Sequence, residues 1–258
     1  DGVQKEKGIL IANLSPKGYA ILNLDDERVS SYKGRTKARI VTFGVNKKSQ
    51  VTARNVVITD EYQTRFDLFI NGTTTGITIP VLGKHFVCSA LAAAAVAYTQ
   101  NIPLSLIKKG IETLKQSPHR MATVKTRSGA IILDDTYNSN PLGVKAAVDA
   151  LSEAGKNRNK IAVLGDMLEL GEYTKKGHEE AGNYAAKMRI TKLICIGDYA
   201  EYLMSGAVSG GMKKSQVTIF KDKESALQLI ENLLNKDSIV LFKASRKLKF
   251  EELVAKLI

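Results

Sequence analysis

The chain of 258 residues has no tryptophan, only two cysteines and no long apolar run. Two cysteines are too few for a disulfide framework or a cysteine-rich zinc site. Cys88 lies in an alanine-rich run and Cys195 in an apolar strand pattern, so both are expected to be small buried hydrophobic residues. The most apolar run, residues 89–98, is about half of the roughly 20 residues that a membrane-spanning helix needs. No membrane is therefore expected as a partner.

Acidic residues are also scarce relative to basic ones. Aspartate and glutamate number 26 against 38 lysines and arginines, a formal net charge of +12. This excess favours anionic partners such as nucleotides or phosphorylated substrates, although a solvated basic surface explains it equally well. The basic residues are scattered and no platform of aromatic and basic side chains stands out, so nucleic acid is not expected as a partner. Residues 1–7 are polar and no apolar segment of a secretory signal follows, which predicts a cytoplasmic protein.

Apolar residues, at 44%, are plentiful, as in a folded globular protein. The length fits one large domain or two modest ones. In the first part of the chain, β-branched and alternating patterns predict strands, and helices follow. The predicted strands are residues 19–23, 39–45, 51–59, 65–70 and 75–81, with a hairpin turn at Gly72, and the predicted helices are residues 85–100 and 104–115.

Ser117 and Pro118 mark a predicted domain boundary, beyond which strands and helices alternate. The predicted strands are residues 130–134, 160–164, 193–196, 217–220 and 238–243, and the predicted helices are residues 141–154, 174–188, 199–208, 223–234 and 247–258. Such alternation predicts a doubly wound, mostly parallel sheet, so the predicted fold class is α/β.

Polar residues gather directly after the strands of this predicted sheet. The groups are residues 134–141, 165–171, 197–198 and 243–246. Ligands of open parallel sheets bind beyond the carboxyl ends of the strands, so these groups are candidates for a site.

The segment 134–141 carries the most information. Asn140 is a good N-cap and Pro141 a good first helical residue, so a loop with a cap explains that end of the segment. It does not explain two adjacent carboxylates followed by Tyr137 and Asn138. A carboxylate such as Asp135 could accept bonds from ribose hydroxyls, and Asn138 could bond a phosphate or a polar substrate. A functional role is therefore favoured for these three residues, whereas Asn140 fits a role and a cap equally.

Other polar groups leave two interpretations open. Residues 243–246 could form an anion site at a helix start or simply carry surface charge. His178, within a helix pattern, is more often structural than chemical. His85 could contact a base or cap the turn before the alanine-rich helix. Arg120, at the domain junction, could reach a phosphate or merely pin the linker.

These motifs resemble those of the Mur ligase family, which builds the peptide of bacterial cell-wall precursors. Residues 134–141, Asp-Asp-Thr-Tyr-Asn-Ser-Asn-Pro, are close to the hallmark of the member that adds D-alanyl-D-alanine to UDP-N-acetylmuramoyl-tripeptide. Residues 165–171 with His178, residues 243–246 and residues 23–26 resemble further segments of the family. The resemblance covers essentially the whole chain.

The sequence departs from the family pattern at several positions. His85 is present, but Phe86 and Ser89 stand where the family has asparagines, which puts part of the adenine contact in doubt. His119 replaces a common glycine before Arg120, and Ala244 replaces the glycine before Ser245. A P-loop, G-x-x-x-x-G-K-[ST], is expected in the family but is absent from this sequence. The chain is therefore expected to be a fragment that is inactive alone.

The resemblance implies the second half of a central ATP-binding domain over residues 1–117 and a Rossmann-like C-terminal domain over residues 118–258. It implies ATP-dependent amide formation through an acyl phosphate, with ATP and Mg²⁺ as cofactors and UDP-N-acetylmuramoyl-tripeptide and D-alanyl-D-alanine as partners. The magnesium ligands are expected upstream of residue 1, and a monomer is expected.

The resemblance also implies roles for individual residues. Asn23, Asp26, His85, Arg120 and Asp135 would bind the nucleotide; Tyr137, Asn138 and Asn140 would be catalytic; and Lys243, Ser245, Arg246 and Asp166 would bind the substrate.

Two alternatives remain. The chain could belong to another Mur-type ligase, similar to folylpolyglutamate synthase or to pseudomurein or cyanophycin enzymes. It could also be a non-catalytic module that binds a nucleotide or peptide.

Overall fold

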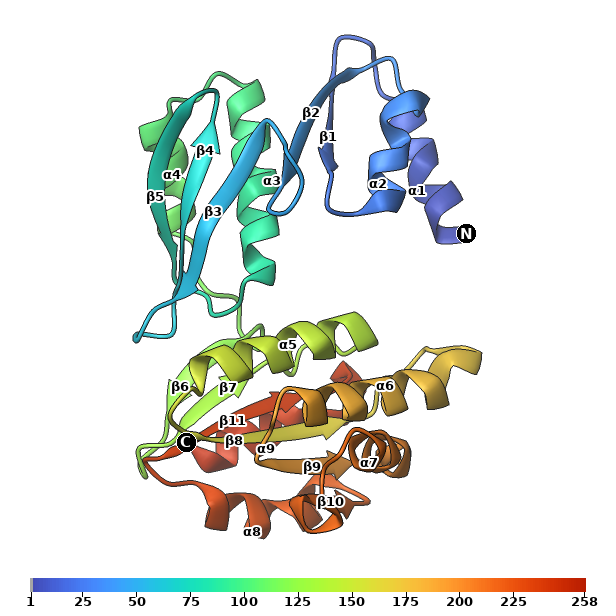
Figure 1. Cartoon of the computed structure of the whole chain (residues 1–258), viewed down its shortest axis with the longest axis vertical. Helices are drawn as coiled ribbons and strands as arrows, with labels where there is room; N and C mark the ends of the chain where they lie inside the picture. The colour runs from blue at the N-terminus through green and yellow to red at the C-terminus, as the bar shows by residue number, and fades with distance from the viewer. Residues whose placement is uncertain (1) are drawn as a thin grey trace. The chain divides into compact units, whose positions relative to one another are not determined.

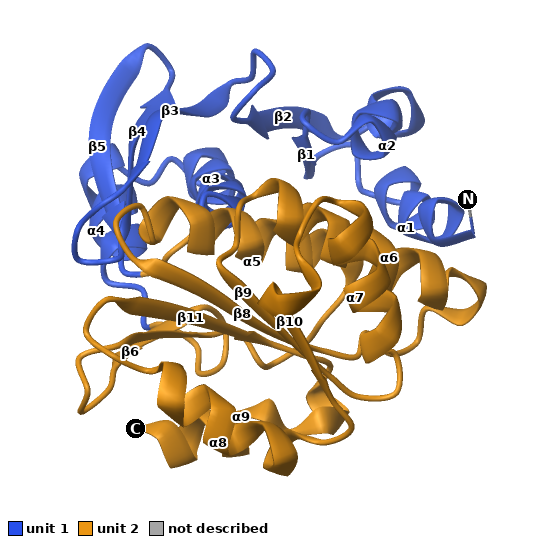
Figure 2. Cartoon of the chain, turned by 60° about the horizontal axis from the view of Figure 1, so that its bottom comes forward, with its two compact units in different colours: residues 1–80, 84–115 blue, residues 81–83, 116–258 orange. Residues whose placement is uncertain are grey.

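The computed structural model describes residues 2–258. The chain folds into two compact units, residues 1–80 with 84–115 and residues 81–83 with 116–258 (Figures 1 and 2). Each unit has its own sheet. Within the described residues, no helix combines the length and apolar character needed to cross a membrane.

The first unit holds a mixed five-stranded sheet in the order β1-β2-β3-β4-β5 (Figure 1). Its strands are β1 (Tyr19–Asn23), β2 (Arg39–Gly44), β3 (Val51–Ile58), β4 (Thr64–Ile70) and β5 (Thr73–Ile79). β1, β2 and β3 run parallel, whereas β3, β4 and β5 pair antiparallel. The turn between β4 and β5 has positive φ at both Asn71 and Gly72, the requirement of a tight hairpin turn, so that prediction is confirmed.

Two helices, α3 (His85–Thr99) and α4 (Leu104–Glu112), pack on this sheet. The buried residues of α3 include Val87, Leu91 and Ala94, which recur at helical spacing and face Phe66 and other core residues of the strands. Cys88, on the same helix, is only half-buried, so the prediction that it is a buried residue is wrong, whereas Cys195 is buried as expected.

The sequence did not predict two helices of the first unit, α1 (Gly2–Ala12) and α2 (Glu27–Ser30). In α1 only Gly8 is buried, and Val3, Ile9 and Leu10 are exposed. Because its apolar residues form no buried stripe, the periodicity that reveals a helix is missing.

The second unit holds a six-stranded sheet in the order β10-β9-β8-β11-β7-β6. Its strands are β6 (Ala122–Lys125), β7 (Ile131–Asp134), β8 (Asn159–Gly165), β9 (Lys192–Ile196), β10 (Val217–Phe220) and β11 (Ser238–Lys243). Only β6, an edge strand that the sequence did not predict, runs antiparallel to its neighbour. The predicted α/β class with a mostly parallel second sheet is confirmed.

Five helices cover the second sheet. α5 (Pro141–Ala154), α6 (Thr174–Lys187) and α7 (Ala200–Ser209) lie on one face, and α8 (Lys223–Leu233) and α9 (Phe250–Leu257) lie on the other (Figure 2). Gly182 and Gly206 allow α6 and α7 to cross closely, since a Cβ atom at either position would collide with the backbone of the other helix. The short 3₁₀ helices of the chain are η1 (Ser31–Arg35), η2 (Gly171–Tyr173), η3 (Lys214–Gln216) and η4 (Arg246–Leu248). The predicted closing helix thus begins later than expected, after η4 and the left-handed Lys249.

The strand order creates a switch point at β11, which lies between β8 and β7. β7 and β8 are followed by α5 and α6 on one face, whereas β11 is followed by α9 on the other. The connections therefore diverge at the carboxyl ends of these three strands, where doubly wound sheets bind their ligands. The loops that meet there are residues 134–140, 166–170 and 243–249.

Candidate functional site

An ion pair between Lys243 and Asp135 lies at the centre of the strand-end loops. The Lys243 ammonium lies 2.5 Å from Asp135 Oδ2 and donates a 3.0 Å hydrogen bond to the Asn138 carbonyl. The lysine is only 4% exposed. Lys243 therefore ties the loop after β7 to the end of β11, and its ammonium is largely occupied by the protein itself.

Asp135 also accepts a 3.2 Å hydrogen bond from the Met121 N–H through Oδ1. A carboxylate offers about four acceptor positions, so two bonds leave capacity for a ligand hydroxyl. The sequence expectation of a ribose contact at Asp135 is compatible with this geometry and stays a prediction.

Tyr137 carries an aromatic ring that is 45% exposed and lies next to two arginines. The Arg120 guanidinium lies 4.1 Å from the ring centroid, and that of Arg246 lies 5.8 Å from it. Both distances are within the range of a cation–π contact. The structure thus brings together three residues that are far apart in the sequence, and the two guanidinium groups suit a phosphate or carboxylate.

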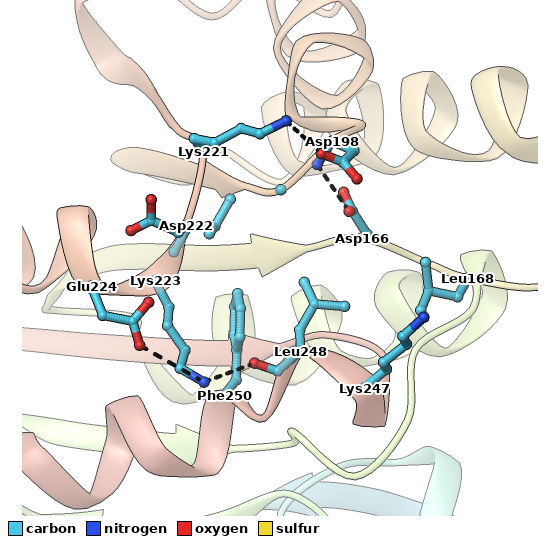
Figure 3. Close-up of a pocket in the computed structure, with 12 residues that line it drawn as sticks. Asp166, Leu168, Asp198, Lys221, Asp222, Lys223, Glu224, Lys247, Leu248 and Phe250 are labelled. Carbon is cyan, nitrogen blue, oxygen red and sulfur yellow. Dashed lines mark hydrogen bonds and ion pairs between the residues drawn. The ribbon is translucent and has the colours of Figure 1, made fainter.

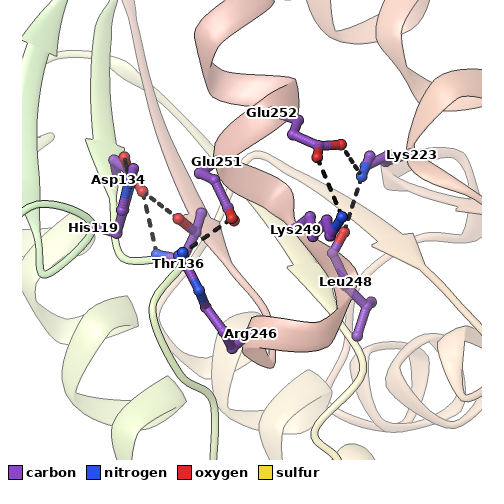
Figure 4. A network of polar contacts seen from close by, with 9 residues as sticks. All are labelled: His119, Asp134, Thr136, Lys223, Arg246, Leu248, Lys249, Glu251 and Glu252. Atoms are coloured by element: carbon purple, nitrogen blue, oxygen red, sulfur yellow. Dashed lines mark hydrogen bonds and ion pairs between the residues drawn. The ribbon is translucent and has the colours of Figure 1, made fainter.

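Glu251, which the sequence analysis missed, holds Arg246 from the first turn of α9. Its Oε1 lies 3.2 Å from Arg246 Nη1 (Figure 4). Its Oε2 is buried and has no hydrogen-bond partner among the described residues. The only signal in the sequence was an acidic residue shortly after a basic motif, which is too common to single out.

Asp134 differs sharply from its neighbour Asp135. It is 5% exposed, and its Oδ1 accepts bonds from the Thr136 N–H and hydroxyl at 3.2 and 2.7 Å. Its Oδ2 lies 2.8 Å from His119 Nδ1 (Figure 4). The two adjacent carboxylates are therefore not equivalent, since Asp134 is bonded within the protein and Asp135 is the more accessible.

The two asparagines of the loop use their side-chain oxygens locally. Asn140 Oδ1 accepts a 2.7 Å bond from the Gly143 N–H, so Asn140 caps α5 with Pro141 as the first helical residue, as the sequence predicted. Asn138 Oδ1 accepts a 2.8 Å bond from the Ser139 N–H. Within residues 2–258 neither amide nitrogen donates a hydrogen bond, so both retain donors for an anionic group.

Asp166 and Ser245 connect the loops of three strands. The Asp166 carboxylate accepts bonds from the N–H groups of Asp198 and Tyr199 at 2.9 and 3.0 Å, and its backbone carbonyl accepts one from the Ser245 N–H. The Ser245 hydroxyl accepts a 2.9 Å bond from the Leu168 N–H. Burial raises the pKa of Asp166, and these two backbone bonds oppose the shift. Their predicted contact with substrate stays a prediction.

A cavity of about 340 Å³ lies beside Asp166, at the ends of β8, β9 and β10 (Figure 3). Its charged lining includes Lys221, which pairs with Asp198 at 2.7 Å, and Lys223, which pairs with Glu252 at 2.8 Å. These two lysines already have acidic partners, whereas Lys247, which also lines the cavity, is exposed and forms no ion pair among the described residues.

His178 is completely buried and acts as a structural link. Its Nε2 accepts a 2.9 Å bond from the Met167 N–H, and its Nδ1 donates to the Thr174 carbonyl at 2.6 Å. Burial lowers the pKa of His178, which favours this neutral form. The structural interpretation of this residue is confirmed.

The remaining predicted residues lie in the first unit. Asn23 Oδ1 accepts a 3.0 Å bond from the Asp25 N–H, and Asp26 caps α2 by accepting bonds from the N–H groups of Arg28 and Val29. His85 is the first residue of α3, and its ring lies 4.2 Å from that of Phe86. Their predicted nucleotide contacts are not tested by these local bonds.

The exposed polar groups of the second unit suit an anionic group. Exposed guanidinium groups and free amide donors suit an anion. Among residues 2–258, no group of three or more His, Cys, Asp or Glu side chains is arranged to hold a metal.

Two family models match the sequence. The Mur ligase middle domain matches residues 1–97, and the domain described as "Mur ligase, glutamate ligase domain" matches residues 119–246. Similar curated proteins include the UDP-N-acetylmuramoyl-tripeptide--D-alanyl-D-alanine ligases of Bacillus subtilis, 32% identical, and Escherichia coli, 30% identical. They match 100% and 98% of this chain, which covers 55% of each. The chain thus spans little more than half the length of these relatives.

Solved structures agree with this similarity. A crystal structure of MurF from Acinetobacter baumannii matches 100% of the chain with a TM-score of 0.88 and 26% identity, and the chain covers 55% of it. MurF ligase from Thermotoga maritima in complex with ADP matches 99% with a TM-score of 0.85, and the chain covers 56% of it. At 21% identity, the second match shows the fold alone.

Proposed function

The chain belongs to the Mur ligase family, and we propose that it is part of an ATP-dependent carbon–nitrogen ligase of peptidoglycan precursor synthesis. The full protein would add D-alanyl-D-alanine to UDP-N-acetylmuramoyl-tripeptide. Residues 1–117 would form the C-terminal half of its central domain, and residues 118–258 its C-terminal domain. The observation that carries the proposal is the match of the whole chain to relatives named for this one activity.

In such a reaction the tripeptide carboxylate attacks the γ-phosphate of ATP to form an acyl phosphate, and the amine of D-alanyl-D-alanine then displaces phosphate. Negative charge gathers on the phosphate oxygens during the transfer, and fixed cations lower the barrier by stabilising it. Arg120 and Arg246, which flank Tyr137, would supply positive charge from the second unit.

The other loop residues would bind and orient. Asp135 would accept the ribose hydroxyls, and the amide nitrogens of Asn138 and Asn140 would donate to phosphate or to the incoming dipeptide. Lys243 would act mainly by holding Asp135 and the Asn138 backbone, because its ammonium is committed to both. Asn23, Asp26 and His85 would approach the nucleotide from the first unit.

Magnesium is assigned to none of these residues, because the described part of the chain offers no metal-binding cluster. The sequence also lacks a P-loop. The magnesium ligands and the P-loop are therefore both proposed to come from a segment outside these 258 residues. The 258 residues alone would therefore not hydrolyse ATP, and phosphate release above background by the purified chain would contradict this.

A ligation assay with the full-length protein tests the activity. Product formation is measured with ATP, UDP-N-acetylmuramoyl-tripeptide and either D-alanyl-D-alanine or glutamate. We expect ligation of the dipeptide only. Ligation of glutamate without that of the dipeptide would instead support another Mur-type ligase.

We also infer that the full protein is a cytoplasmic monomer.

The missing P-loop favours a second candidate function for the chain taken alone, namely a module that binds a nucleotide or peptide without catalysis. Calorimetry of the 258-residue chain with ATP and, separately, with D-alanyl-D-alanine would measure such binding. Heat of binding without turnover would support this second function for the isolated chain.

A further inference from the structure

We propose that His119 is a positioning residue whose bond to Asp134 holds Arg120 against the ring of Tyr137. The Arg120 guanidinium would thereby be preorganised to bind a nucleotide phosphate in the nucleotide-free protein. The inference rests on the proposed function, because it takes Arg120 as a phosphate contact. His119 itself would not touch the nucleotide.

Three hydrogen bonds fasten the residues on either side of Arg120 to the loop after β7. His119 Nδ1 donates to Asp134 Oδ2 at 2.8 Å, since a carboxylate can only accept. The Tyr137 N–H donates to the His119 carbonyl at 3.0 Å. The Met121 N–H donates to Asp135 Oδ1 at 3.2 Å. The first bond ties the His119 side chain to the end of β7. The second ties Tyr137, whose ring the Arg120 guanidinium covers, to the carbonyl directly before Arg120 in the chain.

The backbone around Arg120 needs this support. His119 has φ 60° and Met121 has φ 55°, so Arg120 lies between two left-handed residues. Residues other than glycine seldom adopt this conformation, and they retain it where the surrounding contacts hold them there. A glycine at position 119 would adopt the same φ at no steric cost but would have no ring to bond Asp134.

Asp134 is arranged to serve as the anchor. The residue is 5% exposed, and Oδ1 takes both bonds from Thr136, which leaves Oδ2 for His119. Loss of the His119 ring would leave a charged, buried oxygen without its donor. The loop after β7 would then relax, and Arg120 would spend less time in place over the Tyr137 ring.

The test uses His119→Gly in the full-length protein, with kcat and KM measured for ATP. If only the fraction of molecules with Arg120 in place binds ATP well, the apparent affinity falls with that fraction. Loss of a hydrogen bond to a charged group predicts a rise of roughly tenfold in KM for ATP. At saturating ATP, kcat should change by less than about twofold. A purely structural role would instead reduce the amount of active enzyme and lower kcat at constant KM.

Two further sets of variants sharpen the test. Arg189→Gly is the matched control, because Arg189 is also left-handed, with φ 54°, but its side chain is exposed and makes no bond within the described residues. It should leave KM for ATP unchanged. The combination of His119→Gly with Arg120→Gln should raise KM no further than Arg120→Gln alone, because His119 acts through Arg120.

An unchanged KM in His119→Gly, an equal rise in Arg189→Gly, or additive effects with Arg120→Gln would each overturn the inference. If the wild-type protein does not ligate at all, the proposed function fails separately. The same variants are then compared by calorimetric ATP binding, where a weaker affinity of His119→Gly supports the inference. An unchanged affinity, or no ATP binding by the wild type, overturns it.

Discussion

Replacement of Lys243 by methionine should strongly destabilise the second unit. The side chains of Lys243 and Asp135 are 5% and 14% exposed, and their charged atoms lie 2.5 Å apart. Methionine retains most of the lysine's apolar stem but leaves Asp135 charged, partly buried and without its cation. Removal of one partner of a buried pair costs about 3–5 kcal/mol, and because Asp135 retains some solvent contact we expect about 3 kcal/mol.

Urea unfolding of the 258-residue chain, followed by circular dichroism, measures this change. With a slope of about 2 kcal/mol per molar urea, the midpoint of the second unit should fall by about 1.5 M. The added substitution Asp135→Asn should recover part of the loss, because it removes the stranded charge. Lys247→Met is the matched control, since Lys247 is exposed and should change the midpoint little. If Lys243→Met is no more destabilising than this control, or Asp135→Asn recovers nothing, the argument about the pair is wrong.

Three other predictions follow from single contacts. Asn140→Ala should lower the free energy of unfolding by about 1 kcal/mol, because the cap of α5 is lost. Asn140→Ser should retain most of the wild-type stability, because serine also caps helices, and the midpoints of urea unfolding of the two variants are compared. Because burial lowers the pKa of His178, the unfolded chain binds the proton more readily, so stability should fall by at most ~1.4 kcal/mol per pH unit as pH drops below about 6.5. That slope should be absent in His178→Gln. Glu251→Gln should raise a substrate KM of the full-length ligase by no more than about fivefold. The reason is that the ion pair between Glu251 and Arg246 is partly exposed and worth less than ~1 kcal/mol. A much larger change in KM would show that Glu251 does more than hold Arg246.

The strands of the second sheet were predictable because they are short apolar runs between turn residues. The α5 start was predictable too, since Asn140 and Pro141 act through neighbours in the sequence. β6 was not, because its four residues are half-exposed or exposed and form an edge, so they carry no apolar run. Similarly, α1 buries only Gly8 and shows no helical stripe.

The candidate site was predictable as a set of loops but not as a set of contacts. The order of the strands in the sheet determines which loops lie together, and the pattern of residues along the chain does not reveal that order. Lys243 was expected to contact substrate, but whether its ammonium meets a ligand or Asp135 depends on a pairing over 108 positions. His119 looked like a simple replacement, because its partner Asp134 becomes visible only once β6 and β7 are paired.

The last strand of the chain, β11, is inserted between β8 and β7. Neighbouring strands lie about 4.8 Å apart, so without β11 a gap of roughly 10 Å would separate β7 from β8. A nascent chain that has emerged only as far as β10 therefore cannot complete the second sheet, because β7 and β8 both pair with β11. Premature termination between β10 and β11 should therefore yield an open, aggregation-prone polypeptide.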